Sequence, residues 1–308
     1  MKSTSPDGLL VIDKPRGITS RDVVNRIQEV LPRRTRIGHT GTLDPLATGI
    51  LVVCVGIATR LSEYVQRMEK TYLTRLRLGA QSDTDDTEGL IEALAVPQPP
   101  SKESVIAALE SFVGEIVQTP PSFSAAKVTG QRAYDLARAG REVILSPRTV
   151  HIYALDLRAY DYPWLDIEVR CSKGTYIRSL ARDLGDHLGC GALVETLRRT
   201  RVGVFDLSMA CPIESTRTAF SERLLPLHWA VAELTRLDLQ EPDITHIRQG
   251  QRIAWPSSLV SHDLPAHVGE LAAFGPDGAL VAVVGIDRQQ ELLFPLKVLP
   301  NSDLPGYT

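Results

Sequence analysis

The sequence predicts an α+β fold with a largely antiparallel sheet, followed by a small, mostly β C-terminal module. Segments with strand periodicity and segments with helical periodicity are intermixed through the first part of the chain, without the regular alternation of βαβ units. Beyond residue 234 the character changes, and glycines punctuate short apolar runs. We therefore expect two domains, residues 1–234 and residues 235–308.

The first elements are a short strand and a helix. Gly8–Asp13 reads as an apolar strand that ends at a turn signal, Lys14–Gly17. Thr19 or Ser20 can then cap a helix. The apolar residues that follow recur at helical spacing: Val23, Ile27, Val30 and Leu31. These signals predict a helix directly after the turn.

Strand and helix signals continue through the rest of the first domain. Lys70–Leu78 alternates with a period of two, which predicts a strand. Ser101 opens a helix with its apolar residues on one side. Leu165–Cys171 alternates as another strand and leads into a second helix, which ends at Gly189 and Gly191.

Composition places the chain among ordinary globular proteins, with 43% apolar and 23% charged residues in 308. The polar N-terminus, Met1–Gly8, lacks the apolar stretch of a signal peptide, and the longest apolar run, Ile50–Ala58, is too short to cross a bilayer. The spacing of the cysteines predicts neither a zinc site nor disulfides, and it fits a reducing cytosol. We expect a cytoplasmic protein with no membrane association.

Cationic residues cluster although the net charge is −3. Seven Lys or Arg side chains lie between Lys14 and Arg36, against two acids, and Arg198, Arg199 and Arg201 form a second cluster. Binding to nucleic acid depends on where the cations lie rather than on the mean charge. The clusters permit an RNA partner, but solvated surfaces are often composed in the same way.

The segment Gly38–Gly49 is the most informative stretch. Its three glycines and one proline force an irregular backbone, while neighbouring leucines can anchor it. Such a loop can present His39 and Asp44 from a rigid support. Composition alone leaves an equal alternative, in which Asp44 merely starts a turn and His39 is a structural cap.

This segment closely resembles the catalytic motif of the TruB family of tRNA pseudouridine synthases. Further blocks resemble the same family in the same order along nearly the whole first domain: Leu10–Ser20, Lys70–Tyr72, Ser82–Gly89, Pro120–Lys127, Cys171–Leu180 and Leu197–Arg199. One Leu-Asp pair would be weak evidence, whereas an ordered series of blocks is specific. The resemblance implies a pseudouridine synthase fold.

The resemblance also implies a reaction, the isomerisation of uridine 55 in the T-arm of tRNA to pseudouridine. The N1–C1′ bond breaks, the uracil turns, and C5 joins C1′, so no metal and no cofactor is expected. By resemblance Asp44 is the catalytic carboxylate. It can attack C1′, stabilise positive charge on the sugar as in glycosidases, or remove a ribose proton, and the sequence leaves these three routes open.

Two residues are implied to act beside Asp44. Arg178, at the start of its helix, corresponds to the ion-pair partner that keeps the carboxylate charged in a dry site. Tyr72 corresponds to a stacking platform for the uracil. Considered in isolation, Arg178 would be a surface helix residue and Tyr72 a core aromatic.

The remaining site residues are implied to bind or support. Tyr176 and Leu197 correspond to the pocket around the flipped uracil. His39 is expected to contact the tRNA, in the space that the extruded base vacates. Lys14 is expected to support the active-site loop rather than to touch the reacting base.

The C-terminal module resembles a PUA-type RNA-binding domain, with Asp243–Ile253 as its opening and Leu280–Gly285 as an inner strand of a small barrel. The expected partner is therefore the T-arm of tRNA, bound by a monomer without an obligatory protein partner. Two other functions remain open. One is a tRNA-binding or folding protein in which modification is secondary. The other is a nucleoside hydrolase, whose second carboxylate would come from the acids of Asp83–Glu88.

Overall fold

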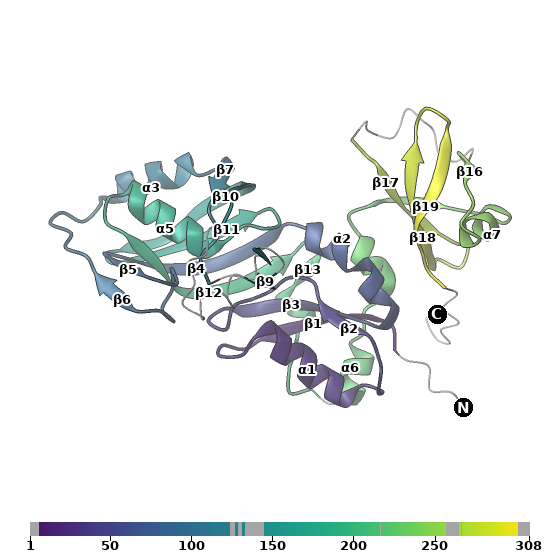
Figure 1. The fold of residues 1–308 in the computed structure, drawn as a ribbon, viewed down its shortest axis with the longest axis horizontal. Helices are drawn as coiled ribbons and strands as arrows, with labels where there is room; N and C mark the ends of the chain where they lie inside the picture. The colour runs from purple at the N-terminus through teal and green to yellow at the C-terminus, as the bar shows by residue number, and fades with distance from the viewer. Residues whose placement is uncertain are drawn as a thin grey trace.

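A computed structural model describes residues 6–123, 127–128, 131–132, 145–215, 217–256, 265 and 267–300. Part of the predicted family block Pro120–Lys127, residues 124–126, lies outside this description. The described chain forms two main sheets (Figure 1). In the larger sheet the strands follow the order β14 (Cys211–Pro212), β1 (Gly8–Lys14), β3 (Thr48–Val55), β12 (Ala192–Val202), β4 (Lys70–Leu78), β11 (Trp164–Cys171), β10 (Arg148–Asp161) and β7 (Gly114–Gln118).

Pairing in the larger sheet is mixed and mainly antiparallel. Only two of its pairs, β1 with β14 and β3 with β12, are parallel among the described strands. β2 (Ile37–His39) adds to β3, and β13 (Phe205–Asp206) adds to β12. The expectation of an α+β fold with a largely antiparallel sheet is therefore confirmed.

The alternation predicted for β4 decides which face of the sheet is covered. Leu76 and Leu78 are buried in the main core, whereas Leu73 on the opposite face is 39% exposed. Two helices cover the buried face, α3 (Lys102–Ser111) and α5 (Ile177–His187), and their apolar residues join the same core. Figure 1 shows both helices over the strands β10 and β11.

The predicted helix starts are confirmed by their caps. Thr19 is the N-cap of α1 (Ser20–Val30), where its hydroxyl accepts from the backbone N–H of Asp22 and the Asp22 carboxylate accepts from the backbone N–H of Thr19. Ser101 is the N-cap of α3, where its hydroxyl accepts from the backbone N–H of Ser104. Tyr176 occupies the N-cap position of α5 without a side-chain cap bond.

Smaller elements complete the larger domain. These are the short hairpins β5–β6 and β8–β9 and several short helices. Their bounds are β5 (Ala80–Ser82), β6 (Ile91–Ala93), β8 (Lys127–Val128), β9 (Gln131–Arg132), η1 (Gly56–Leu61), α2 (Ser62–Arg67), η2 (Leu207–Met209), α6 (Arg217–Glu222) and η3 (Leu227–Val231).

The C-terminal sheet is a separate set of strands, as the change in sequence character predicts. It follows the order β15 (Thr235–Asp238), β17 (Glu270–Phe274), β18 (Leu280–Asp287), β19 (Leu292–Val298) and β16 (Ile253–Ala254), with α7 (Asp243–Arg248) packed beside it. β18 is the middle strand, in agreement with the inner strand expected at 280–285. The described strands form an open sheet with β15 and β16 at its edges, so a closed barrel stays a prediction.

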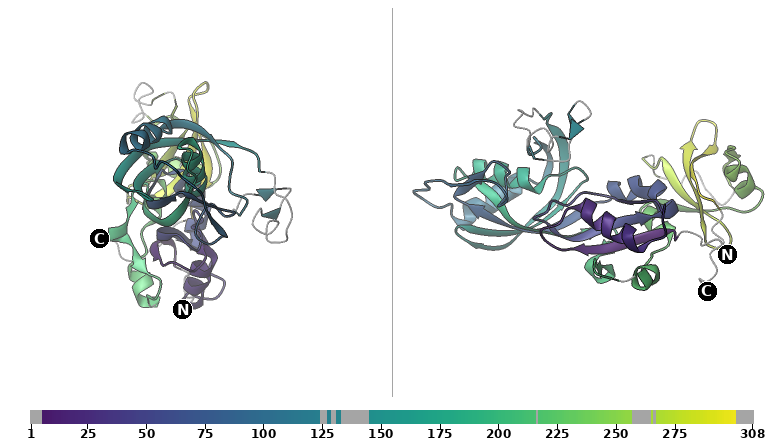
Figure 2. Two further views of the ribbon diagram at one scale, coloured as in Figure 1. Left: turned by 90° about the vertical axis from the view of Figure 1, so that its left-hand side faces the viewer. Right: turned by 60° about the horizontal axis from the view of Figure 1, so that its bottom comes forward.

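An apolar core joins the two sheets. It combines residues of β1 and β3 with residues of η3, β17 and β18. Two ion pairs add to this contact, Arg67 with Glu270 and Lys297 with Glu63, so α2 is tied to the C-terminal sheet. Figures 1 and 2 show this sheet at one end of the elongated molecule. No helix in the described ranges is long and apolar enough to span a membrane.

Candidate active site

The loop between β2 and β3 carries Asp44 on a buried apolar support. Leu43, Leu46 and Ala47 are each at most 3% exposed, whereas the Asp44 side chain is 34% exposed. The loop is thus anchored by its neighbours while the carboxylate remains accessible. This is the arrangement expected from the pattern of Gly38–Gly49.

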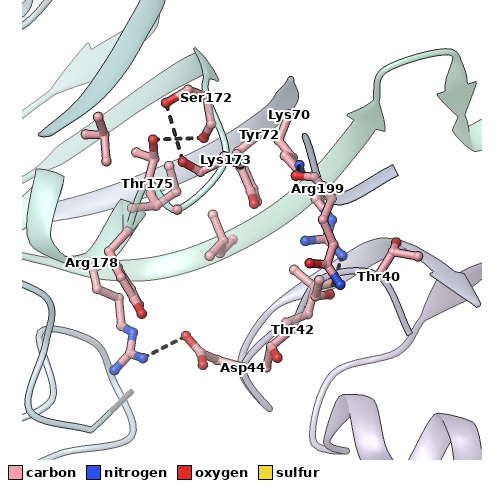
Figure 3. Close-up of a pocket in the computed structure, with 18 of the residues that line it drawn as sticks. Thr40, Thr42, Asp44, Lys70, Tyr72, Ser172, Lys173, Thr175, Arg178 and Arg199 are labelled. Carbon is pink, nitrogen blue, oxygen red and sulfur yellow. Dashed lines mark hydrogen bonds and ion pairs between the residues drawn. The ribbon is translucent and has the colours of Figure 1, made fainter. Parts of the chain in front are cut away.

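Arg178 and Asp44 form an ion pair. Arg178 Nη2 lies 2.9 Å from Asp44 Oδ2, and the arginine side chain is only 5% exposed. The same guanidinium donates to the backbone oxygens of Thr84 at 2.9 Å and Phe123 at 2.8 Å. These further bonds fix its plane, so that it presents one edge to the carboxylate (Figure 3).

A second carboxylate, Asp86, neutralises the buried arginine. Asp86 Oδ2 lies 3.5 Å from Arg178 Nη1, and the residue is 2% exposed. Its Oδ1 accepts from Thr84 Oγ1 at 2.6 Å and from the backbone N–H of Glu88 at 2.9 Å. Sequence reasoning assigned no individual role to Asp86 among the acids of Asp83–Glu88. No spacing rule connects it to Arg178, which lies 92 positions later.

A cavity of about 610 Å³ lies beside this ion pair. Six of the seven predicted site residues line it: His39, Asp44, Tyr72, Tyr176, Arg178 and Leu197. They come from elements far apart in the sequence, namely β2, the loop before β3, β4, the start of α5 and β12. Figure 3 shows Asp44 and Arg178 together at one side of this space.

The two tyrosines are held in different ways. Tyr72 is 8% exposed on β4, and burial raises the pKa of its hydroxyl, which therefore remains protonated at neutral pH. Tyr176 lies at the junction before α5, where the buried Gln118 side chain accepts from its backbone N–H at 3.1 Å and donates to its carbonyl at 3.3 Å. Because of this junction, Tyr176 and Arg178 both reach the cavity although they are only two residues apart.

Lys14 lies outside the cavity lining, beneath the Asp44 loop. It is fully buried, and its Nζ donates to the carbonyls of Ile18 at 2.7 Å, Pro15 at 3.0 Å and Pro45 at 3.4 Å. Burial lowers its pKa to about 8, and the nearby Asp44 carboxylate opposes this shift. Its contacts are with the backbone around the loop, which agrees with the expected supporting position.

Several cationic residues of the cavity were not singled out from the sequence. Arg148, Lys173, Lys70 and Arg199 all line it. The guanidinium of Arg148 lies 5.3 Å from the centre of the Tyr176 ring, and burial lowers the pKa of Lys70 to about 8. Arg199 was recognised as part of a basic cluster, but composition alone did not show that this arginine is buried while its neighbours remain accessible to solvent.

The described residues contain no cluster of three or more His, Cys, Asp or Glu side chains suited to hold a metal ion. The polar groups of the cavity are instead one carboxylate, several cations, two phenols, one imidazole, one amide and hydroxyls. Such a site can hold a neutral aromatic base between aromatic and apolar side chains, with a carboxylate beside it.

Comparisons with known proteins identify the family of the chain. The N-terminal domain of TruB family pseudouridylate synthases matches residues 28–177, and the C-terminal domain of tRNA pseudouridylate synthase B matches residues 178–226. A tRNA pseudouridine synthase B from Syntrophobacter fumaroxidans is 40% identical over 92% of this chain and 94% of its own length. Another, from an Arthrobacter species, is 41% identical over 97% of this chain and 99% of its own length.

Solved structures support the fold. An H/ACA RNP bound to a substrate RNA containing 2'-deoxyuridine aligns with a TM-score of 0.72 and 22% identity, over 96% of this chain and 86% of that chain. An archaeal box H/ACA sRNP Nop10-Cbf5 complex aligns with a TM-score of 0.70 and 22% identity, over 96% and 87%. The expected pseudouridine synthase fold is confirmed. With relatives at this identity spanning nearly its whole length, the chain belongs to the TruB family of pseudouridylate synthases.

Proposed function

We propose that this chain isomerises uridine 55 in the T-arm of tRNA to pseudouridine, with Asp44 as its catalytic carboxylate. The observation that carries the proposal is the pair of Asp44 with the buried Arg178 at the edge of a cavity lined by Tyr72, Tyr176 and Leu197. An arginine that is already bonded to backbone carbonyls orients the carboxylate at low cost in entropy. Family membership supplies the substrate class.

The chemistry matches the groups present. The N1–C1′ bond of uridine breaks, a C5–C1′ bond forms, the C5 proton is lost, and N1 gains a proton, so the atoms balance without an external reactant. Asp44 is the charged group that acts at the ribose, where positive character develops. In this proposal the ring of the buried Tyr72 stacks on the uracil.

The substrate uridine must leave the T-loop to reach Asp44, because a stacked base cannot enter a cavity between β4, α5 and β12. In this proposal the extruded uracil lies between Tyr72, Tyr176 and Leu197, and His39 contacts the tRNA. Lys14 supports the loop from below. All these assignments are supported by the position of each side chain at or beneath the cavity.

The other assignments are proposed at the level of the whole chain. We assign residues 1–234 to the synthase domain and residues 235–308 to a PUA-like RNA-binding domain, with support from the separate strand sets. We also propose that the protein acts in the cytoplasm as a monomer without an obligatory protein partner. Light scattering of the purified chain tests the oligomeric state, and a stable dimer would contradict it.

The positions of Asp85 and Asp86 do not favour a hydrolase. Asp85 pairs with Arg182 at 2.8 Å, and Asp86 is buried against Arg178. Neither of them lines the cavity, so neither is placed to activate water beside Asp44. Asp44 is the carboxylate among the residues that line it.

The direct test is incubation of the purified chain with an unmodified tRNA transcript, followed by mapping of pseudouridine by position. We expect pseudouridine at position 55 and no free uracil, whose release would instead indicate a hydrolase. Asp44→Asn should retain affinity for tRNA and form no pseudouridine. Product formation by this variant at the wild-type rate would refute the catalytic assignment. Tight binding without product from the wild-type chain would favour the tRNA-binding function.

A further inference from the structure

One buried arginine contacts both ends of the Asp44 loop. Arg199 is 3% exposed on β12, and its Nε donates to the carbonyl of Ile50 at 2.7 Å while its Nη2 donates to the carbonyl of Gly41 at 3.1 Å. Gly41 and Ile50 flank the segment that contains Asp44. A single planar guanidinium therefore fixes the distance between the entrance and the exit of the loop.

A buried serine contacts the middle of the same loop. Ser20 is 2% exposed at the start of α1, and its hydroxyl donates to the carbonyl of Leu43 at 3.0 Å. The same oxygen accepts from the backbone N–H of Leu43 at 2.8 Å. Leu43 precedes Asp44 directly, so both polar backbone groups next to the carboxylate are satisfied by one side chain.

The close approach of β12 to the loop makes the arginine contacts possible. Arg199 is paired with Gly49 in the parallel register of β12 and β3. Gly49 has a φ of +95°, and a Cβ at this position would lie 2.2 Å from the carbonyl oxygen of Arg199. The glycine thus permits the contact between backbones from which the Arg199 side chain reaches Gly41 and Ile50.

We propose that Arg199 and Ser20 are positioning residues that hold the Asp44 loop in the geometry that the reaction requires. The inference deepens the proposed function and rests on it. The hydrogen bonds that carry it go to the backbone of Gly41, Leu43 and Ile50, so both side chains act on Asp44 through the backbone on each side of it. Gly41 and Leu43 lie between β2 and β3, outside any strand ladder, and these side chains supply hydrogen-bond partners for their backbone groups.

The test uses Ser20→Ala, Arg199→Met and Arg199→Lys in steady-state assays of pseudouridine formation. Ser20→Ala leaves the Thr19 cap in place and introduces a good helix former, so α1 is not weakened. Misplacement of the carboxylate should lower kcat on the order of 100-fold in the variants, and KM should stay nearly unchanged in Ser20→Ala, because Ser20 lies outside the cavity lining. Arg199→Lys keeps the charge but cannot make both bonds at once, and it should be impaired almost as much as Arg199→Met.

Two matched controls accompany these variants. Thr35→Val removes another buried hydroxyl, whose Oγ1 donates to the carbonyl of Pro32 at 2.7 Å away from the cavity. Arg75→Met removes a bonded guanidinium on the outer face of β4, where it pairs with Asp166. Both controls should retain a kcat close to that of the wild type.

Hydrogen exchange measured by mass spectrometry gives a readout independent of activity. Ser20→Ala and Arg199→Met should speed amide exchange in residues 41–50, while peptides from β17 and β18 exchange as in the wild type. The proposal would be overturned if Ser20→Ala and Arg199→Met kept the kcat of the wild type, or if Arg199→Lys were fully active. Faster amide exchange throughout the chain of these variants, rather than in residues 41–50, would also overturn it. If Arg199→Met does not fold, Ser20→Ala decides alone. If the wild-type chain forms no pseudouridine, the proposed function fails, but exchange in residues 41–50 still tests the attachment of the loop.

Discussion

The buried charges around the Asp44 loop are stabilised in two ways, by carboxylates or by backbone carbonyls. Arg178 lies between two carboxylates, Asp44 and Asp86, and only Asp44 is accessible. A buried guanidinium without a counter-charge would be strongly unfavourable, and the buried Asp86 supplies such a counter-charge to Arg178. Lys14 differs, because its Nζ donates to backbone carbonyls at the base of the loop.

The desolvation of Lys14 predicts an unusual pH dependence of stability. Its folded-state pKa of about 8 lies below the ordinary value of 10.5, so the unfolded chain binds more protons between these two pH values. The contribution of Lys14 to the free energy of unfolding is therefore least favourable below pH 8 and improves as the pH rises toward 10.5. Between pH 7.5 and pH 9.5 the improvement is about 2 kcal/mol.

Urea unfolding of the wild type and of Lys14→Met at these two pH values isolates this contribution, because other titrating groups cancel in the difference. The stability of the wild type relative to Lys14→Met should be about 2 kcal/mol greater at pH 9.5 than at pH 7.5. Lys102→Met, at an exposed position of α3, controls for the loss of a lysine charge. A difference that stays constant or falls with pH would contradict the buried, desolvated state of Lys14.

Elements with regular periodicity were predictable from the sequence. β4, α1, α3 and α5 have one buried face, so the spacing of their apolar residues is set by the geometry of a strand or a helix. The caps Thr19 and Ser101 follow from local hydrogen bonding and were readable for the same reason.

β12 and β10 were not predicted, and the reason lies in their irregular pairing. β12 has register shifts between Val194 and Thr196 and between Arg199 and Arg201, and β10 has two of its own. A bulge interrupts the alternation of inward and outward side chains, so the sequences of these strands do not show the alternating apolar pattern that identifies a strand. The place of Leu197 at the cavity was therefore expected only from family resemblance, and that of Arg199 was not expected at all.

The contact between β3 and β12 predicts a specific requirement for glycine at position 49. Gly49→Ala introduces a side chain at a φ of +95° and a Cβ 2.2 Å from the carbonyl oxygen of Arg199. Gly114→Ala is a matched control, because Gly114 has a φ of +106° but a Cβ added there would meet no atom within 4 Å. The control should cost ~1–2 kcal/mol through backbone strain alone.

Gly49→Ala should lower the free energy of unfolding by about 1–3 kcal/mol more than the control, because a backbone carbonyl cannot move aside without shifting β12. Urea unfolding of both variants measures this difference. The activity of Gly49→Ala should also fall well below that of Gly114→Ala, since the Asp44 loop ends at this contact. Equal stability of the two variants would show that β3 and β12 separate easily here.

At the scale of the whole molecule, the arrangement of the two sheets could not be predicted from the sequence. The change in sequence pattern near residue 234 indicated a second module. The core shared by β1, β3, η3 and β18 depends on how two surfaces pack together, and the periodicity of a single segment does not predict this. This core and the ion pairs of α2 fix the C-terminal sheet to the larger sheet. Because α2 also supplies Gln66 to the cavity lining, the attachment lies close to the site.

The distribution of charge over the molecule leads to the last prediction. The chain has a net charge of −3, yet Arg148, Lys173, Lys70 and Arg199 line the cavity together with Asp44. Lys70 and Arg199 donate to backbone carbonyls and are buried, whereas Lys173 is exposed and Arg148 is half-buried. Arg148 and Lys173 are therefore the cations of the cavity best placed to meet phosphates of a bound tRNA.

Arg148→Ala and Lys173→Ala should each weaken tRNA binding and lower the steepness of its salt dependence. A cation that neutralises one phosphate releases about one counterion, so the slope of log K against log salt should fall by about 0.7–0.9 for each variant. Filter binding between roughly 50 and 200 mM salt measures both quantities, with Arg75→Ala on the outer face of β4 as the control. Lys173 is exposed and is not one of the residues proposed to hold the uracil, so kcat of Lys173→Ala at saturating tRNA should change little. A weaker affinity with an unchanged slope of log K against log salt would mean that these side chains act by packing rather than by charge. Wild-type affinity in both variants would show that neither side chain belongs to the RNA interface.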